Sequence, residues 1–481
     1  MDKSILNSYI DSHKDLLTGL SDTIWDYAEL SIQEYRSAES YISILKDQGF
    51  RVEEKLAGIP TAFSGSFGQG KPVIGMVGEY DDLSGLSQAA CVTQKQAEPN
   101  QSNGHGCGHN LLGAGSLGAA IAIKQAIENG ILSGTVVFYG CPGEEGCAGK
   151  TFMARDGLFR DLDAAICWHP GDVNAVTTGS CAACLQLEYT FTGISAHAAG
   201  DPENGRSALD AAELMNVGVQ FLREHISKTA SIHYAFSDAG GISPNVVQPV
   251  AKVIYMIRET TVRRAKALVE RVNRIAQGAA LMTDTQLSVC QLDGTSNTLS
   301  NTVMEQLIYE NLCHTTMVSY SDSEQAYAAA LKESFPVSPV CSDYPLSPAE
   351  RTKIDDDTEN GKRPLNDFVI PYHPSFLYNP GSTDVGDVSW LTPTAQFTAA
   401  TWVSGSPGHS WQNVSCGHTS ISHKATILAG KVIAATAIDL IEKPEVLQAA
   451  KDEFEAKMKR YGGYFCPVPE GAVPAVPGEK M

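Results

Sequence analysis

The chain has 481 residues and a formal net charge of −20, with 55 acidic residues against 35 lysines and arginines. This charge repels nucleic-acid phosphates and anionic lipid, and no compact basic stripe offsets it. Because the length exceeds that of one compact core while 43% of the residues are hydrophobic, we expect a globular protein of at least two domains.

Signals for secretion and membrane insertion are not recognisable. Charged residues interrupt the apolar positions of residues 1–20, unlike the h-region of a secretory signal. No segment has the apolar length that a membrane span needs. The 12 cysteines are scattered along the chain, a pattern typical of reduced thiols. We therefore expect a cytoplasmic protein.

Helical and strand patterns alternate in the first part of the chain. Residues 4–48 predict two amphipathic helices, and the apolar run 72–80 predicts a buried strand. After a polar loop at 84–104, a helix is expected over 111–128, capped by Asn110 and closed by Gly130. Further strands are expected at 135–141 and 164–168. This alternation predicts an α/β fold with a mainly parallel sheet and helices on both faces.

Polar residues follow three of these strands directly. They are Asp81, the pair Glu144 and Glu145, and His169. Functional groups of parallel sheets collect at the carboxyl ends of the strands. We therefore expect these side chains to lie at one edge of the sheet.

The pattern changes in the middle of the chain. Strands at 185–193, 231–236, 246–258 and 285–292 and helices at 206–225 and 261–278 give the order β-α-β-β-α-β. This order predicts an α+β split βαβ, or ferredoxin-like, domain at 184–296, inserted into a domain formed by 1–183 and 297–481. Residues 318–366 are interpreted as an irregular surface insertion, 422–442 as a helix and the tail after Cys466 as extended.

Cys107 and His109 stand two positions apart between glycines, just before an apolar run. This spacing lets a thiolate and an imidazole meet on one ion of the Zn, Mn or Co class. Alone, such a pair is more often a buried thiol beside a hydrogen-bonded histidine. His169 and His409 leave the same alternative open, and His418 and His423 compete with His409.

Glu144 and Glu145 are adjacent acids in a predicted turn. One of them can bind a cation while the other acts on a water molecule. The alternative is a pair of helix-start acids stabilised by the helix dipole. Beside Cys107, His109 and His169, the metal interpretation becomes the stronger one.

Gly113, Gly115 and Gly118 match the spacing of a dinucleotide-binding fingerprint. They lie inside a helical run, however, and not in a turn directly after a strand. We interpret them as a site of close helix packing.

Taken together, these motifs make the chain similar to the cocatalytic metallopeptidases and amidohydrolases that include aminoacylase, bacterial glutamate carboxypeptidase and the plant auxin-conjugate hydrolases. The resemblance covers nearly the whole chain. It rests on five stretches: Gly104-His105-Gly106-Cys107-Gly108-His109-Asn110, Cys141-Pro142-Gly143-Glu144-Glu145-Gly146, and residues 205–210, 240–245 and 382–390.

The resemblance implies two divalent metal ions, zinc or manganese, with one ligand bridging them. Its implied ligands are Cys107, His109, Glu145, His169 and His409. Glu144 would be the general base, and Asp81 would orient a ligand.

The resemblance also implies substrate-binding residues in the inserted domain, which would serve as a lid and a dimerisation domain. His197 would support the oxyanion and Arg258 would clamp a free α-carboxylate. Asn245 lies thirteen residues before Arg258, and we expect the two to border one pocket. In the family the histidine reaches the active site of a second chain, so the implied assembly is a homodimer or a heterodimer with a related sister subunit.

Three positions depart from the family pattern. Glu79 stands where many relatives have a metal-binding histidine, Asn110 replaces a common aspartate, and Glu203 occupies a position where close relatives carry histidine. The first departure concerns the ligand set of one ion, and the last concerns contacts with the substrate.

The resulting expectation is a metal-dependent amidohydrolase that cleaves the amide between an aromatic acyl group and glutamate. A second interpretation keeps the chemistry and changes the substrate to an N-acyl amino acid or a dipeptide. A third is a noncatalytic metal-binding partner chain. The presence of Glu144 argues against the third, because a purely structural site has no use for an unligated base.

Overall fold

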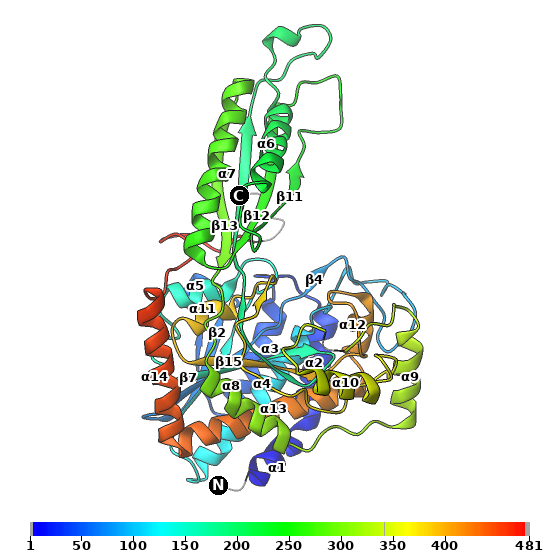
Figure 1. Ribbon diagram of the computed structural model, residues 1–481, viewed down its shortest axis with the longest axis vertical. Helices are drawn as coiled ribbons and strands as arrows, with labels where there is room; N and C mark the ends of the chain where they lie inside the picture. The colour runs from blue at the N-terminus through cyan, green and yellow to red at the C-terminus, as the bar shows by residue number, and fades with distance from the viewer. Residues whose placement is uncertain (1–2, 341, 477–481) are drawn as a thin grey trace.

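The computed structural model describes residues 3–340 and 342–476 and contains two units (Figure 1). The larger unit is built on a seven-stranded sheet with the strand order β1-β2-β6-β3-β7-β15-β8. The smaller unit, which we call the four-stranded unit, has the order β11-β12-β10-β13. It projects from one end of the larger unit (Figure 1).

Three helices precede the sheet, where two were predicted. They are α1 Ser4–Ser12, α2 Lys14–Tyr27 and α3 Tyr35–Asp47. His13 ends α1 and starts α2 with non-helical angles (φ −105°, ψ 6°). The apolar period continues across this residue, so the pattern gave no sign of the break.

The centre of the seven-stranded sheet is parallel and its edges are antiparallel. Strands β6, β3, β7 and β15 pair in parallel, whereas β1 with β2, β2 with β6, and β15 with β8 pair antiparallel. The bounds are β1 Arg51–Glu54, β2 Phe63–Gln69, β3 Val73–Gly78, β6 Gly134–Gly140, β7 Ala164–Gly171, β8 Ala175–Thr177 and β15 Thr394–Ala400.

Helices cover both faces of this sheet, as predicted. Ile74 and Met76 of β3 join the core formed with α4 His109–Glu128, α8 Thr302–His314 and α13 Ser420–Glu442. Val77, on the opposite face, joins the core formed with α5 Gly149–Arg155 and α11 Val385–Ser389. Alternate side chains of one strand therefore enter two different cores.

Helix α4 begins one residue earlier than its predicted cap. Gly108 precedes it with φ +78°, and the Asn110 side chain donates to Ser21 Oγ at 3.0 Å without capping the helix. The capping role predicted for Asn110 is therefore wrong, while Gly130 follows the helix with φ +69° as expected. A Cβ atom at Gly113 would meet Tyr41 of α3, and one at Gly115 would meet the Thr426 carbonyl of α13, which confirms the close helix packing.

The four-stranded unit has the predicted β-α-β-β-α-β order. Its elements are β10 Ala183–Thr192, α6 Ala208–Arg223, β11 Ser231–Asp238, β12 Val250–Glu259, α7 Val262–Thr283 and β13 Gln286–Thr295, with the short η2 Pro202–Asn204. All its strand pairs are antiparallel. Both helices pack on its sheet around a separate apolar core that includes Tyr189, Phe191 and Tyr255.

Residues 318–366 are not irregular throughout, which corrects the prediction. They contain α9 Asp322–Lys332 and α10 Pro348–Asp357. Each helix starts with a capping box, Ser321 with Glu324 and Ser347 with Glu350. The Ser-x-x-Glu signature was therefore present in the sequence, but the polar composition concealed it.

The remaining elements connect or flank the two units. They are η1 Leu56–Gly58, β4 Leu83–Ser84, β5 Asn103–Gly104, β9 Ser180–Cys181, β14 Tyr378–Asn379, α12 Trp411–Cys416 and α14 Pro444–Tyr461. Helix α14 was not predicted. Within the predicted extended tail, residues 467–476 form neither helix nor strand, and 477–481 lie outside the described residues. Among the described residues, no helix has both the length and the apolar character that crossing a membrane requires.

Candidate metal centre

The predicted site residues come together at the carboxyl edge of the parallel strands. Asp81 follows β3, Glu144 and Glu145 follow β6, and His169 lies near the end of β7. Strand β7 continues to Gly171, so His169 lies inside the strand and not just after it as predicted. Cys107 and His109 stand at the start of α4, and His409 stands in the loop before α12.

Three overlapping groups of three potential ligands lie at this edge. Two of them contain Cys107, which is grouped with His109 and His169 and also with Glu145 and His409. The third group is His109, Glu144 and Glu145. Within each group the ligand atoms lie within 4.8 Å of one another. Cys107, His109 and Glu145 each belong to two of the three groups.

Two measured separations fit ligands that converge on an ion. Cys107 Sγ lies 3.3 Å from His169 Nε2, and His409 Nε2 lies 3.3 Å from Glu145 Oε1. Bonds of about 2.1–2.3 Å that meet at one ion place their ligand atoms roughly 3.0–3.7 Å apart. His409 is the exposed member of the set and has φ +50°.

Asp81 orients His109 from behind. His109 Nδ1 lies 2.9 Å from Asp81 Oδ1, while Asp81 Oδ2 accepts from Ser31 Oγ at 2.7 Å and from the Glu145 backbone N–H at 2.9 Å. Burial alone would raise the pKa of Asp81, but its hydrogen bond with His109, the His109 charge and the other donors lower it to about 2. The carboxylate thus holds the imidazole with Nε2 facing the site.

Glu144 belongs to the third group but to neither of the two groups that contain Cys107. Its carboxylate lies near His109 and Glu145. Burial raises the pKa of Glu144 well above its usual value, and the nearby charges of Glu79 and Glu145 raise it further. A carboxyl group in this position can hold a proton that a solvent-exposed glutamate would lose.

The site contains buried polar atoms that lack hydrogen-bond partners and could bind divalent cations. Glu145 Oε1 and His109 Nε2 are buried, and neither has a hydrogen-bond partner among the described residues. Burial also raises the pKa of the Cys107 thiol, and a bound cation would reverse this effect. The donors are sulfur, nitrogen and oxygen, a set that suits zinc or manganese. The residues therefore fit divalent metal ions.

Sequence reasoning missed several residues that support the site. Glu34 accepts the Gly143 N–H at 2.8 Å and so fixes the turn that carries both glutamates. Lys150, fully buried, bridges Glu79 at 2.7 Å and Asp384 at 2.6 Å. The sequence did contain a sign that Lys150 is unusual, because it is the single charged residue in the stretch 146–154. Glu34 gave no recognisable signal.

The predicted substrate residues are divided between the two ends of the four-stranded unit. Ala198 N donates to Asn245 O at 3.0 Å, which places His197 and Asn245 together in the loops beyond β10 and β11. These loops form the far tip of the unit (Figure 1). Arg258 lies near the base, where its Nε donates to Ser382 Oγ at 3.3 Å.

Asn245 and Arg258 do not border one pocket within a chain, which corrects that expectation. They lie at opposite ends of β12, which spans about 30 Å at roughly 3.4 Å per residue. The predicted strand at 246–258 already separated the two residues along its length, and the expectation of a shared pocket did not take this length into account. Glu203 is exposed in η2, in the same tip region.

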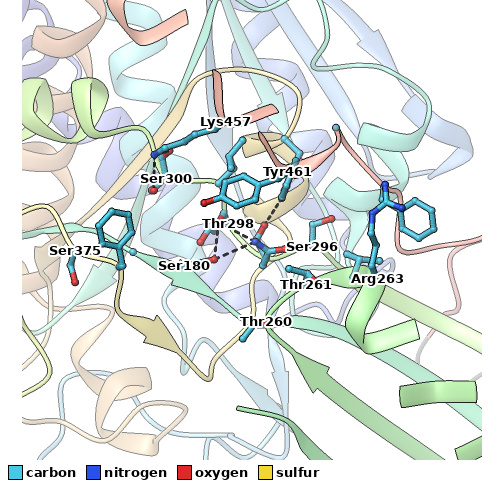
Figure 2. A pocket seen from close by; sticks show the side chains of 18 residues that line it. Ser180, Thr260, Thr261, Arg263, Ser296, Thr298, Ser300, Ser375, Lys457 and Tyr461 are labelled. Carbon is cyan, nitrogen blue, oxygen red and sulfur yellow. Dashed lines mark hydrogen bonds between the residues drawn. The ribbon is translucent and has the colours of Figure 1, made fainter. Parts of the chain in front are cut away.

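A cavity of about 320 Å³ lies at the junction of the two units. Figure 2 shows Lys457 and Arg263 on different sides of it, with Ser296 and Thr298 between them. None of the metal-ligand candidates lines this cavity. The ligand groups and this cavity are therefore separate features.

Comparison with known proteins agrees with this geometry. The model of the peptidase family M20/M25/M40 matches residues 91–435. One subunit of the p-aminobenzoyl-glutamate hydrolase of Escherichia coli K12 is 41% identical over 98% of this chain and 98% of its own length. A second subunit of the same Escherichia coli enzyme is 29% identical over 48% of this chain and 57% of its own length.

A solved structure shares the fold. It is a dinuclear metal-binding peptidase of family M20 from Bacillus subtilis, which superposes with a TM-score of 0.55 at 17% identity. The match covers 90% of this chain and 99% of that one. The chain is thus a hydrolase that acts on amide bonds and uses divalent metal, and it belongs to the peptidase family M20/M25/M40.

Proposed function

We propose that the protein hydrolyses p-aminobenzoyl-glutamate to p-aminobenzoate and glutamate. The similarity of nearly the whole chain to the 41% identical Escherichia coli relative supports this substrate. The observation that carries the chemistry is the position of the Glu144 carboxylate within 4.8 Å of ligand atoms of His109 and Glu145, outside the two groups that contain Cys107. We further propose two divalent ions, zinc or manganese, held by Cys107, His109, Glu145, His169 and His409.

Divalent ions held by these five residues would supply polarisation of the amide carbonyl and a lower pKa of the attacking water. Glu144 takes a proton from this water as the new carbon–oxygen bond forms. The same carboxyl then delivers the proton to the nitrogen of glutamate as the carbon–nitrogen bond breaks. The ionised form of Glu144 needed for the first step is favoured by neighbouring cations, which oppose the effect of burial.

His197 is suited to donate a hydrogen bond to a developing oxyanion. Its Nδ1 accepts the backbone N–H groups of Ala199 at 3.2 Å and Gly200 at 3.0 Å. This arrangement assigns the proton of a neutral ring to Nε2, which leaves Nε2–H as a donor. The side chain is exposed at the tip of the four-stranded unit.

We propose that residues 184–296 act as a lid and dimerisation domain inserted between 1–183 and 297–481. Leu214, Val217 and Phe221 of α6 are 38%, 53% and 66% exposed and follow a helical spacing, so they offer an apolar face to another chain. The partner is a second copy or a sister subunit, and the similarity to both Escherichia coli chains favours the sister. Through such an interface, His197 of one chain would serve the metal site of the other.

Hydrolysis of p-aminobenzoyl-glutamate by the purified chain tests the proposal. We expect release of glutamate by the chain with a coexpressed sister subunit, and weaker or no release by the chain alone. The Glu144→Gln variant, prepared in the same way, is the control for contaminating hydrolases. Metal-loaded preparations that cleave other N-acyl amino acids or dipeptides but not this compound would contradict the substrate assignment.

We place the reaction in the cytoplasm. The eleven cysteines of the described residues are all free thiols. A reduced cysteine as a metal ligand also suits a reducing compartment.

A further inference from the structure

The cavity at the junction of the two units has no role in the proposed reaction. Its volume is about 320 Å³, and small-ligand sites have volumes of roughly 300–1,000 Å³. Its walls come from the two segments that connect the units, 179–180 and 296–300, from the start of α7 and from the segment 457–465. A position between two units is common for ligand sites.

The chain that follows α14 closes one side of the cavity. Tyr464 Oη donates to Asp387 Oδ1 of the larger unit at 2.7 Å. Gln291 Nε2 of the four-stranded unit donates to Pro467 O at 3.0 Å. Phe465, which lines the cavity, lies between these two anchored positions. This wall is therefore held by bonds to both units.

Aromatic side chains form part of the cavity wall. Trp390 is 7% exposed, and its Nε1 donates to Asn297 O at 2.7 Å, so the indole ring is held in place. Tyr461 stands edge-on to it, with the ring centroids 6.4 Å apart and an interplanar angle of 72°. Phe376, which also lines the cavity, is 100% exposed. An aromatic ring that enters the cavity would meet other rings, which pair favourably with it.

One cation at the cavity lacks an acidic partner. Arg263 forms no ion pair within residues 3–340 and 342–476; its guanidinium lies 4.7 Å from the Phe465 ring centroid and donates to Gly462 O at 3.5 Å. Lys266 lies 4.5 Å from the same ring and likewise has no carboxylate partner in the described part of the chain. Two unpaired cations around one ring, in a protein of net charge −20, favour an anionic ligand at this end of the cavity.

Lys457, on the other side of the cavity (Figure 2), has no free donor for the same ligand. Its ammonium group donates to Ser300 O at 2.6 Å and to Ser300 Oγ at 3.1 Å, and it pairs with Glu453 at 2.8 Å. These contacts use the three N–H donors of the lysine. The cavity therefore has free cationic donors at one end, which match a ligand with a single anionic group.

We propose that this cavity is a second ligand site, which binds a small aromatic monocarboxylate. The ring packs against Trp390 and Tyr461, and the carboxylate accepts from the free N–H groups of the Arg263 guanidinium. Such a ligand touches both connecting segments and would hold the four-stranded unit in one orientation relative to the larger unit. The proposal does not depend on the substrate of the metal centre.

Binding of benzoate to the metal-loaded, full-length chain tests the site. Benzoate should slow hydrogen–deuterium exchange of the backbone amides of 296–300 and 461–465, and the effect should saturate with a Kd of about 1 mM or tighter. Arg263→Gln should weaken this binding by at least about tenfold, because it removes a charge-assisted hydrogen bond. Arg264→Gln is the matched control and should bind like the wild type, because Arg264 is the next residue of α7 and already pairs with Glu259 at 2.8 Å.

Benzamide is a further control that needs no variant. It keeps the ring and removes the charge, so it should bind at least about tenfold more weakly than benzoate. Protection that is confined to the segments around Cys107 and Glu144 would overturn the proposal, because it would place benzoate at the metal centre. Equal binding of benzoate and benzamide, or equal binding by Arg263→Gln and the wild type, would overturn it as well.

Discussion

Glu144 and Glu145 are neighbours in the sequence but meet different partners. The Glu145 carboxylate lies 3.3 Å from His409, and its backbone N–H is held by Asp81. The Glu144 carboxylate lies within 4.8 Å of a His109 ring nitrogen. The charges of Glu79 and Glu145 also act on Glu144 and raise its pKa, in addition to the larger effect of burial. The proposed function therefore assigns metal binding and proton transfer to adjacent residues on one turn.

This separation predicts different outcomes for two matched variants. Glu144→Gln should keep its metal ions and lose turnover by roughly 100- to 10,000-fold, the usual contribution of a general base. Glu145→Gln should lose an ion, because it removes a ligand. Metal content and kcat measured on the same preparations give the answer. Loss of metal in Glu144→Gln, with retention in Glu145→Gln, would mean that the two roles are exchanged.

Arg258 is the residue assigned to the free α-carboxylate of the substrate. It lies at the base of the four-stranded unit beside Ser382, two residues before Asp384. Arg258→Ala should raise KM for substrates with a free α-carboxylate by roughly 10- to 100-fold, since a hydrogen bond to a charged group contributes about 1.5–3 kcal/mol.

The corresponding α-amide substrate should be affected much less by Arg258→Ala. Arg264→Ala is a suitable control, because Arg264 pairs with Glu259 at 2.8 Å on the exposed side of α7. Equal losses on the acid and the amide would exclude a carboxylate-binding role for Arg258.

The candidate site was largely predictable from the sequence because its ligands follow recognisable strand ends. Cys107, His109, Glu145 and His169 all lie at or next to the ends of predicted elements. Glu34 and Asp384 were not predictable in the same way. They act through contacts to Gly143 and Lys150, which are distant in the sequence. Only the folded chain brings these partners together.

Helices α9 and α10 show that a polar composition alone does not exclude helices. The region is polar, but local hydrogen bonds start each helix, and α9 adds tertiary ion pairing. Glu324 caps α9 through Ser321, accepts from Ser420 at 2.5 Å and pairs with Lys424 at 2.7 Å. A single side chain thus starts α9 and attaches it to α13.

The attachment of α9 should depend on pH. Burial raises the pKa of Glu324, but Lys424, Ser420 and the Ser321 N–H outweigh this effect and lower it from 4.5 to about 2. A lowered folded-state pKa means that the stabilisation is complete above about pH 4.5 and is lost as the pH falls toward 2. We expect about 1–2 kcal/mol at neutral pH, because the Lys424 side chain is 40% exposed.

Chemical denaturation of the wild type and of Glu324→Gln between pH 7 and pH 3 measures this effect. Glutamine can still bond the Ser321 N–H, so the variant mainly removes the charge. The difference in the free energy of unfolding should shrink as the pH falls. A difference that is constant over this range would assign the effect to packing and not to the carboxylate charge.

At the scale of the whole molecule, the two units divide the predicted functional residues. The larger unit carries every metal-ligand candidate, whereas His197 and Asn245 stand at the far tip of the four-stranded unit (Figure 1). The β-α-β-β-α-β order was predictable from alternating patterns. The distance between tip and metal site was not, because sequence order does not show how far a unit projects.

This separation makes the proposed assembly testable by complementation. If the partner is a second copy and His197 completes its site, Glu144→Gln chains still supply a functional His197, and His197→Ala chains still supply a functional metal site. Mixed dimers of the two inactive variants then contain one complete site out of two. Mixtures prepared by exchange of chains should therefore regain up to roughly a quarter of wild-type activity, because half of the dimers are mixed and each has one complete site.

Differently tagged chains, purified together, verify that exchange took place. If verified mixed dimers stay inactive while each variant binds its metal, the two residues must act within the same chain. His197→Ala chains that are fully active on their own would instead remove His197 from the mechanism.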